Sequence, residues 1–386
     1  MNVVLFDDEL TWRNLLPLTF TRPIAEVRIG ILSISKKWEL TLGLNISYQT
    51  QNYLSKKFSN HLEQENLFIN SCVCPNPALK EAIQKLQNNE YLINNQLVIA
   101  YKSSTYLGNQ ASNLKSVNFE SPFLSIHSVT DIFTKNDLAL QADFELITKN
   151  RISQALDASV TVIGDRKKVF LEKGAKAQAC ILNTNTGPIY LGEDSEIMEG
   201  SIVRGPLALC EHSVLKMATK IYGATTIGPH SKVGGELNNS VIFGYSNKAH
   251  DGFLGNSVIG EWCNLGADTN NSNLKNNYSH VKLYNYAQNK AIDSGLQFCG
   301  LIMGDYSKSG INTMFNTGTV VGIACNIFGA GFPPTHIPSF SWGGDKGFEK
   351  YQTEKLFETT SKMFERRGLN FSELDKDIIH SVDKNQ

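Results

Sequence analysis

The chain has 386 residues, more than one typical domain, so we expect two domains with sizeable cores. Its 36 Lys and Arg nearly balance 37 Asp and Glu, and no basic run marks a nucleic-acid-binding surface. No stretch approaches the roughly 20 apolar residues of a membrane span, and no secretory signal is visible. Seven scattered cysteines without a CxxC pair argue against a disulfide framework or a zinc site, and we expect free thiols in a cytoplasmic protein.

The first 150 residues alternate short apolar runs with helical stretches. We expect strands at 2–6, 45–48, 67–73 and 96–101, and helices near 31–42, near 51–58 and at 76–86. Strands that alternate with helices favour a parallel sheet with helices on both faces. Ligands of such sheets bind beyond the carboxyl ends of the strands, so the loop after Phe6, which leads to Arg13, is the expected ligand site.

A six-residue period dominates the second half of the chain, after a helical junction at 131–150. Every sixth residue from Leu191 to Val233 is aliphatic, and most residues four places further on are Ser or Thr. This period fits a solenoid whose coils use six residues per side, with an aliphatic side chain inside and a small one at the corner. Such a parallel β-helix buries its apolar row only by stacking coil on coil.

The period breaks in one hexad. After a slip of two residues, Asn247 falls in an aliphatic slot and Asp251 in a corner slot, with His250 between them. An unpaired buried polar group costs on the order of 1–3 kcal/mol, so an irregularity inside a regular pattern marks a candidate functional site. The alternative is a loop at which the register slips, which would expose both polar residues. The inward positions predicted beyond Val233 are Val241, Asn247, Phe253, Ile259 and Leu265, and then, after an excursion at about 271–300, Met303, Ser309, Phe315, Val321 and Ile327.

The end of the chain changes character. Prolines and glycines at 333–344 (PPTHIPSFSWGG) are expected to terminate the repeat. From Gly347 an amphipathic helix should dock on the coil, and SELD at 372–375 predicts a capping box that begins a short last helix. The predicted domains are therefore 1–150, 151–344 and a helical tail at 345–386.

The irregular hexad and its surroundings resemble a known family. KAHDGFLGNSVIGEWCNLGADTNNSNLKN (248–276) is similar to the acetyltransferase half of the bifunctional glucosamine-1-phosphate acetyltransferase/N-acetylglucosamine-1-phosphate uridyltransferases. These belong to the hexapeptide-repeat acyltransferases, which implies a left-handed β-helix, a homotrimer and acetyl-CoA as a substrate. The resemblance implies His250 as the catalytic base, and Ala267, Asn273 and Ala330 as acyl-CoA or acceptor contacts.

The chemistry of the hexad agrees with that role. Acetyl transfer from a thioester needs a base near neutrality, which suits histidine, and Asn247 or Asp251 could orient the imidazole. The sequence departs from the family at Leu274 and Lys275, where a tyrosine and an aspartate are usual, so whether the acceptor is an amine or a hydroxyl stays open.

The first half resembles the partner domain of the same family. RNLLPLTFTRP (13–23) is similar to the signature of sugar-1-phosphate nucleotidyltransferases, which implies that Arg13, Thr19 and Arg22 bind nucleotide or phosphate. The family's glycine-rich loop is replaced by LFDDELTWR, and its metal-binding aspartate by Tyr101-Lys102. Asp7 or Asp8 is then the candidate Mg²⁺ ligand.

These observations predict a transferase of amino-sugar nucleotide biosynthesis. Its substrates would be a sugar phosphate, a nucleoside triphosphate and acetyl-CoA, with neither nucleic acid nor membrane as a partner. Two alternatives remain: a uridylyl- or thymidylyltransferase with a purely structural β-helix, and a non-catalytic protein that binds sugar nucleotides or acts in assembly.

Overall fold

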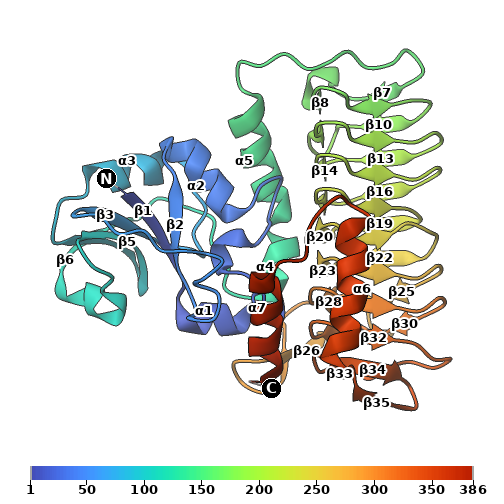
Figure 1. Cartoon of the computed structure of the whole chain (residues 1–386). Coiled ribbons are helices and arrows are strands. Elements are labelled where there is room, and N and C mark those ends of the chain that lie inside the picture. Colours follow the sequence, from blue (N-terminus) through green and yellow to red (C-terminus); the bar gives the residue numbers. More distant parts are fainter. Residues whose placement is uncertain (1, 385–386) are drawn as a thin grey trace.

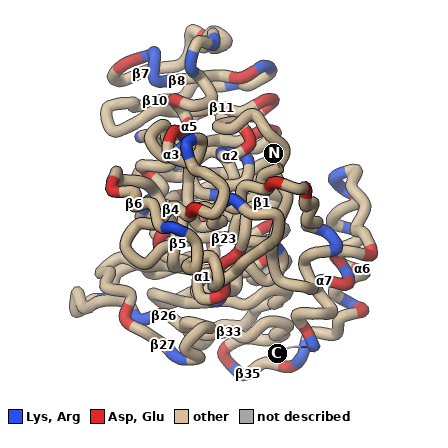
Figure 2. Tube along the Cα trace, turned by 90° about the vertical axis from the view of Figure 1, so that its left-hand side faces the viewer, with Lys and Arg blue, Asp and Glu red and all other residues tan. Residues whose placement is uncertain are grey.

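The computed structural model describes residues 2–384. An N-terminal α/β domain lies beside an upright β-helix, and two C-terminal helices lie across the lower half of the molecule (Figure 1). Lys and Arg are interspersed with Asp and Glu along the trace (Figure 2), as the nearly neutral composition predicts.

The N-terminal domain is built on one six-stranded sheet. β1 (Asn2–Phe6) pairs in parallel with β2 (Ile46–Gln49) and β3 (Asn66–Asn70), as the sequence predicts. The other half is mixed, because β5 (Leu97–Ser103) runs antiparallel to both β3 and β4 (Glu90–Asn94), and β6 (Lys115–Asn118) closes the sheet in the order β2-β1-β3-β5-β4-β6. The short hairpin between β4 and β5 reverses the chain, which a crossover helix would not do.

Three helices of the domain begin with sequence-encoded caps. Asp8 caps α1 (Glu9–Asn14), Ser33 caps α2 (Ile34–Leu42), and Asn76 caps α3 (Pro77–Lys85), each by accepting a backbone N–H bond. The helix predicted near 51–58 is wrong, since residues 52–57 form successive turns. The segment is nevertheless packed, since Leu54 is fully buried.

The second domain is a parallel β-helix with three faces. The first face contains β7 (Thr161–Ile163), β10 (Ile181–Asn183), β13 (Ile202–Arg204), β16 (Lys220–Tyr222), β19 (Glu236–Asn238) and β22 (Phe253–Gly255). The second contains β8 (Val169–Leu171), β11 (Ile189–Leu191), β14 (Leu207–Leu209), β17 (Thr225–Ile227), β20 (Val241–Gly244), β23 (Val258–Glu261), β28 (Ile302–Met303), β31 (Val320–Val321) and β33 (His336–Ile337). The third contains β9 (Lys176–Ala177), β12 (Glu196–Ile197), β15 (Val214–Leu215), β18 (Lys232–Val233), β21 (Asn247–Lys248), β24 (Asn264–Leu265), β29 (Lys308–Ser309), β32 (Asn326–Ile327), β34 (Ser341–Gly344) and the antiparallel β35 (Gly347–Lys350).

The aliphatic row from Leu191 to Val233 fills the interior, as predicted. Beyond it, the predicted register is wrong by one residue over three positions. Strand pairing places Ile242, Lys248 and Leu254 inside, where the sequence had suggested Val241, Asn247 and Phe253. The turn at Gly234-Gly235 is two residues shorter than its neighbours, and the inward steps from Leu237 to Ile242 and from Leu254 to Ile259 take five residues instead of six. Three positions therefore lie one residue from the prediction, and the second short step restores agreement at Ile259.

Strand β25 (Asn270–Asn271) pairs with β30 (Met314–Phe315). The excursion that follows β25 contains a hairpin of β26 (Lys282–Asn285) and β27 (Lys290–Asp293). Asn285 donates to Asn14 of the N-terminal domain at 3.0 Å, so the hairpin bridges the domains. The junction helices α4 (Val129–Thr134) and α5 (Asn136–Thr148) lie against the second face. Asn136 donates to Ala224 O at 3.1 Å, which ties α5 to the coil.

The C-terminal part continues the coil before it becomes helical. β33 and β34 pair in parallel with β31 and β32, so residues 333–344 extend the repeat instead of ending it. α6 (Thr353–Glu365) and α7 (Glu373–Lys384) follow. The capping box is confirmed, because Asp375 N donates to the Ser372 hydroxyl at 3.2 Å and Ser372 N donates back to the carboxylate at 3.1 Å.

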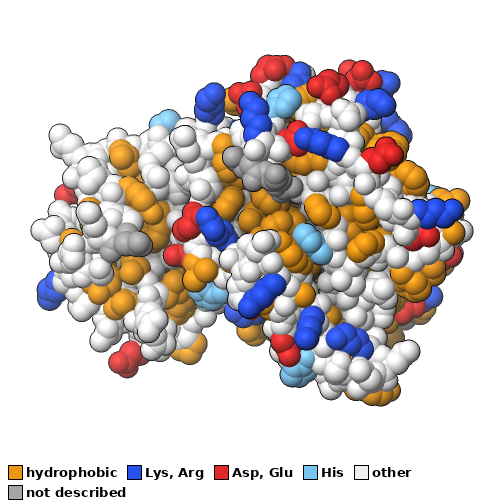
Figure 3. Space-filling model, turned by 90° about the horizontal axis from the view of Figure 1, so that it is seen from below, with side chains coloured by type: hydrophobic (Ala, Val, Ile, Leu, Met, Phe, Trp, Pro, Cys, Tyr) orange, Lys and Arg blue, Asp and Glu red, His pale blue; other side chains and the backbone are white. Residues whose placement is uncertain are grey.

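No helix among residues 2–384 is both long and apolar enough to span a bilayer. All seven cysteines are buried as free thiols. The lower end of the molecule mixes apolar and charged side chains (Figure 3).

Candidate functional site

The largest of the cavities that we describe, about 720 Å³, lies between the third face of the β-helix and α6. Strands β18, β21, β24 and β29 form its floor, and the last turn of α6 with the two residues that follow forms its roof. We call it the coil cavity. Its lining consists of Lys232, Tyr245, Asn247, Ala249, His250, Trp262, Cys263, Asn264, Leu265, Gly266, Ala267, Lys308, Ile311, Thr359, Met363, Arg366 and Arg367.

A column of stacked rings holds α6 in place over this cavity. His212, His230, Tyr245 and Trp262 occupy the same corner of successive coils, with ring centroids 4.4–4.8 Å apart. Phe364 of α6 stacks on Trp262 at 3.9 Å and ends the column. Phe364 lies only two and three residues before Arg366 and Arg367, which is less than one helical turn. The stacking of Phe364 therefore determines where the two arginines lie.

The lining of the coil cavity is strongly cationic. Lys232, Lys308, Arg366 and Arg367 border it together with His250, and no Asp or Glu does. In the part of the chain that the structure describes, none of the four cations forms an ion pair. Four uncompensated positive charges around one cavity favour an anionic ligand.

His250 lies on a turn that opens onto the cavity. The residue is exposed and lines the wall, and no described side chain hydrogen-bonds its imidazole. Asn247 lines the same wall, and its Oδ1 is buried without a partner. Asp251 is exposed and does not line the cavity. Of the two residues predicted to orient the imidazole, Asn247 is the one that the fold brings to the same wall.

Two predicted acyl-CoA contacts lie elsewhere in the single chain. Ala267 lines the coil cavity, as the resemblance implies. Asn273 donates to Asn256 Oδ1 at 2.8 Å on the other side of the coil, and Ala330 is exposed near the lower end. Neither borders the cavity.

Sequence reasoning missed the cations of this site. The sequence analysis singled out none of Lys232, Lys308, Arg366 and Arg367, and it expected the helix of the tail only to dock on the coil. The available signal was a pair of adjacent arginines just after the end of a predicted helix. Only the docking of α6 joins them to β18 and β29.

The N-terminal domain has its own cleft, about 520 Å³, at the carboxyl ends of β1, β2 and β3, where the sequence predicted a ligand site. Asp7, Asp8 and Glu9 line it, and no Lys or Arg does. Asp7 accepts hydrogen bonds from Thr50 at 2.6 Å and from Ile24 N at 3.1 Å. Burial nevertheless raises the pKa of Asp7 to about 7.

The three residues of the RNLLPLTFTRP signature do not border this cleft. Arg13 is exposed and pairs with Glu9 at 2.8 Å. Thr19 is fully buried, and its hydroxyl donates to Trp12 O at 2.9 Å. Arg22 is buried at the domain junction and pairs with Asp305 of the β-helix, and with Glu261 at 3.3 Å.

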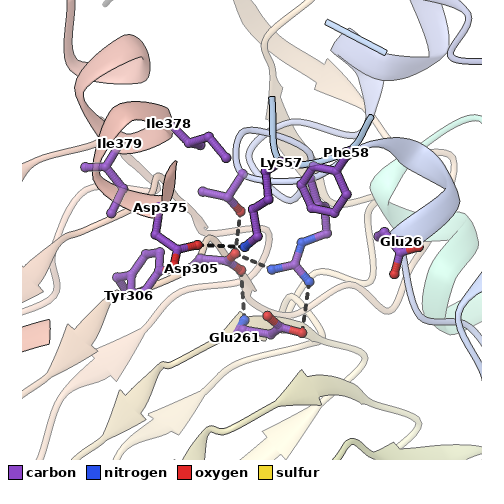
Figure 4. A pocket seen from close by; sticks show the side chains of 11 residues that line it. Glu26, Lys57, Phe58, Glu261, Asp305, Tyr306, Asp375, Ile378 and Ile379 are labelled. Carbon is purple, nitrogen blue, oxygen red and sulfur yellow. Dashed lines mark hydrogen bonds and ion pairs between the residues drawn. The ribbon is translucent and has the colours of Figure 1, made fainter. Parts of the chain in front are cut away.

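Arg22 lies in a small polar cavity, about 200 Å³, where three parts of the chain meet. Figure 4 shows Asp305 and Glu261 of the β-helix, Lys57 of the N-terminal domain and Asp375 of α7 around it. Thr21 also donates to Asp305, and Glu261 N donates to the same carboxylate at 2.8 Å. Burial by itself would lower the pKa of Arg22, but Asp305 and Glu261 raise it above its ordinary value, so the guanidinium stays charged. In this structure the signature arginine joins the domains.

Metal ligands are not preassembled in either domain. Within residues 2–384 no three side chains of His, Cys, Asp or Glu gather in a group that could hold a metal ion. Magnesium usually takes only one or two carboxylates from the protein and its other ligands from phosphate and water. Asp7 and Asp8 fit that smaller requirement, since both line the cleft.

Comparison with known proteins agrees with the two-domain architecture. Residues 3–152 match the family model described as sugar nucleotidyl transferase. The N-terminal domain is therefore similar to sugar nucleotidyltransferases, and in this chain it is joined to a β-helix with a cationic cavity.

The relatives are described as bifunctional proteins. The chain is 30% identical over 144 residues to the bifunctional sugar-1-phosphate nucleotidylyltransferase/acetyltransferase of Sulfurisphaera tokodaii, which covers 37% of this chain and 35% of that protein. It is 28% identical over 214 residues to the bifunctional protein GlmU of Alkaliphilus metalliredigens, and the match covers 49% of this chain and 44% of that protein. A GlmU of a Cyanothece strain is 25% identical and covers 64% of this chain and 52% of its own length. The chain thus matches between about a third and a half of these proteins.

Among solved structures, the polySia-specific acetyltransferase NeuO is 14% identical and covers 54% of this chain and 100% of its own, with a TM-score of 0.27. An Arabidopsis UDP-N-acetylglucosamine acyltransferase is 17% identical, and the match covers 53% of this chain and 77% of that protein, with a TM-score of 0.24. At these scores the likeness carries no argument about function.

Proposed function

We propose that this protein is a transferase of amino-sugar nucleotide biosynthesis whose β-helix moves an acetyl group from acetyl-CoA to a sugar phosphate. The observation that carries the proposal is the coil cavity, in which an exposed histidine lies among four unpaired cations and no carboxylate. Coenzyme A is a polyanion with a long neutral arm, so its phosphates match the cations. The thioester would then lie near His250.

The reaction follows from these groups. The imidazole of His250 takes a proton from the attacking amine or hydroxyl of the acceptor. The freed nucleophile adds to the thioester carbonyl, and the tetrahedral intermediate collapses by breaking the C–S bond, which leaves the acetylated sugar phosphate and the thiolate of CoA. The imidazolium of His250 then gives its proton to the thiolate, which forms the thiol and restores the base. Backbone N–H groups on the rigid coil are the available donors to the oxyanion.

The test is thiol release from acetyl-CoA with a panel of hexosamine 1-phosphates as acceptors. We expect release that depends on one acceptor of the panel. The proposal fails if no acceptor accelerates release above hydrolysis. The same proposal includes a homotrimer in the cytoplasm. In this trimer Asp251, Asn273 and Ala330 would contribute to the site from a neighbouring copy. Sedimentation measures whether the protein is a trimer.

Arg366 and Arg367, which directly follow α6, should determine the affinity of the protein for acetyl-CoA. Replacing Arg366 or Arg367 with Ala should each raise the Kd for CoA about 10- to 150-fold, because a charged hydrogen bond contributes about 1.5–3 kcal/mol. The loss should shrink as salt is added, since it is electrostatic. Titration calorimetry measures it, and Lys362→Ala, on the same helix but outside the cavity, is the matched control. Equal affinities in all variants would remove CoA from this cavity.

We propose that the N-terminal cleft takes a nucleoside triphosphate and a sugar 1-phosphate only with Mg²⁺. Three acidic residues and no cation line the cleft, so a bare triphosphate would be repelled. Asp7 and Asp8 would hold the metal, which would neutralise phosphate charge. UTP or dTTP should therefore bind with Mg²⁺ and not with EDTA, measured by calorimetry, and pyrophosphate should appear when sugar 1-phosphate is added. Binding without product would favour a domain that recognises sugar nucleotides without catalysis.

A further inference from the structure

Lys248 is a charged residue in a slot that the neighbouring coils fill with an aliphatic one. β21 pairs in register with β18, which places Lys248 opposite Val233. The pairing of Asn247 with Asn264 places it next to Leu265 on the following coil. Its side chain is 2% exposed, and it has no ion pair among the described residues. Burial lowers the pKa of Lys248 and the charges of Asp251 and Asp268 raise it, but neither carboxylate contacts its ammonium group, so the hydrogen bonds of that group must come from elsewhere.

The ammonium group of Lys248 is bonded to the turn that carries His250. Nζ donates to the backbone oxygen of His250 at 2.6 Å and to that of Asp251 at 3.1 Å. Burial lowers the pKa of Lys248 to about 8, so most molecules keep its charge at pH 7. Two charge-assisted bonds therefore reach the turn from inside the coil.

In other coils, a corner hydroxyl bonds the same turn at a different point, the carbonyl oxygen of the residue that follows the inward one. Four residues after the inward Leu215, Thr219 Oγ1 donates to Lys216 O at 2.5 Å. Four residues after Ser309, Thr313 Oγ1 donates to Gly310 O at 2.8 Å. The equivalent position after Lys248 is Gly252, which has no hydroxyl. This turn therefore lacks the corner hydroxyl, and its bonds from the interior are those that Lys248 donates to His250 O and Asp251 O.

The corner at Gly252 cannot hold a larger residue. Its φ is +114°, and a Cβ there would lie 2.3 Å from Thr269 O. Below the turn, a Cβ on Gly234 would lie 2.5 Å from Ala249 O. The adjacent coils thus confine the turn from above and below, and the interior side depends on Lys248.

We propose that Lys248 is a positioning residue that fixes the turn 249–252 from within the coil and so holds the imidazole of His250 at the wall of the coil cavity. This rests on the acetyl transfer proposed above, since the position of His250 matters only if the imidazole acts there. A displacement of about 1 Å in a catalytic group can reduce a rate about 100-fold.

Lys248→Met tests the proposal, because methionine fills the slot without a charge. We expect kcat for acetyl transfer to fall 10- to 100-fold, while KM for acetyl-CoA and the Kd for CoA stay within about twofold. The melting temperature should not fall, because replacing a buried charge with an apolar side chain is often neutral or stabilising. Lys248→Leu, which copies Leu265, is the second variant should methionine not fold. Lys220→Met, an exposed lysine of the first face, is the control.

A double-mutant cycle separates positioning from general loosening. If Lys248 acts through His250, Lys248→Met should cause no further loss in a His250→Ala background. An unchanged kcat in Lys248→Met, or an equal further loss in that background, would overturn the inference while leaving the acetyl transfer intact.

A second measurement does not depend on activity. The Cε1–H resonance of the His250 imidazole should be displaced or broadened in Lys248→Met and unchanged in Lys220→Met. If the wild-type protein acetylates no acceptor, the proposed function fails, and this resonance still decides whether Lys248 holds the turn. An identical resonance in all three proteins would show that it does not.

Discussion

His250→Ala should reduce acetyl transfer by about 10²- to 10⁴-fold, the usual contribution of a general base. The side chain is exposed and its imidazole has no described hydrogen-bond partner, so we expect the melting temperature and the Kd for CoA to stay unchanged. Added imidazole should restore part of the rate, because a small base can enter the space that the alanine leaves. Thiol release at saturating acetyl-CoA and acceptor is the measurement.

The matched control is His280→Ala, an exposed histidine on the excursion that does not line the coil cavity. It should keep the wild-type rate. A His250→Ala protein as active as His280→Ala would remove the base from the proposed reaction, although the cationic cavity would still bind its ligand.

Asp305→Ala should destabilise the whole protein by about 3–5 kcal/mol, the typical result of leaving a buried charge without its partner. Asp305 receives bonds from Arg22, Thr21 and Glu261 N, and both ionic side chains are almost fully buried. Since the pair joins the N-terminal domain to the β-helix, both should unfold in one earlier transition. Urea unfolding followed by tryptophan fluorescence and circular dichroism measures it.

The double variant Arg22→Met/Asp305→Leu is the decisive companion. Removing both charges leaves neither unpaired, so it should recover most of the lost stability. A single Asp305→Ala change that costs less than about 1 kcal/mol would mean that Glu261 alone is enough for Arg22, and that the cluster does not hold the domains together.

The regular parts of the fold were predicted well, because residues that are close in sequence determine periodicity and helix capping. The hexad period from Leu191 to Val233 places all its aliphatic residues in the interior, and the SELD box begins α7 as expected. The cleft at the carboxyl ends of the strands follows in the same way from the parallel half of the sheet. These features depend on periodicity and capping, which nearby residues determine.

The candidate site was only half predictable, because its register depended on turn length. The sequence located the irregular hexad and the resemblance singled out His250, but the inward polar residue is Lys248 and not Asn247. The short turn at Gly234-Gly235 and the five-residue steps to Ile242 and Ile259 change the count in a way that a period of six does not contain. A lysine is usually exposed to solvent, and only the strand pairing shows that Lys248 lies inside the coil.

By itself, the sequence determined the two architectures, the order of the domains, and the place along the chain where the coil becomes irregular, since each is written in spacing and residue type. The tertiary structure alone decided which groups share a site: Arg366 and Arg367 meet Lys232 and Lys308 only because Phe364 stacks on Trp262. Likewise, Arg22 finds Asp305 across a sequence separation of 283 residues. Such contacts depend on how finished elements dock, and no local pattern records that.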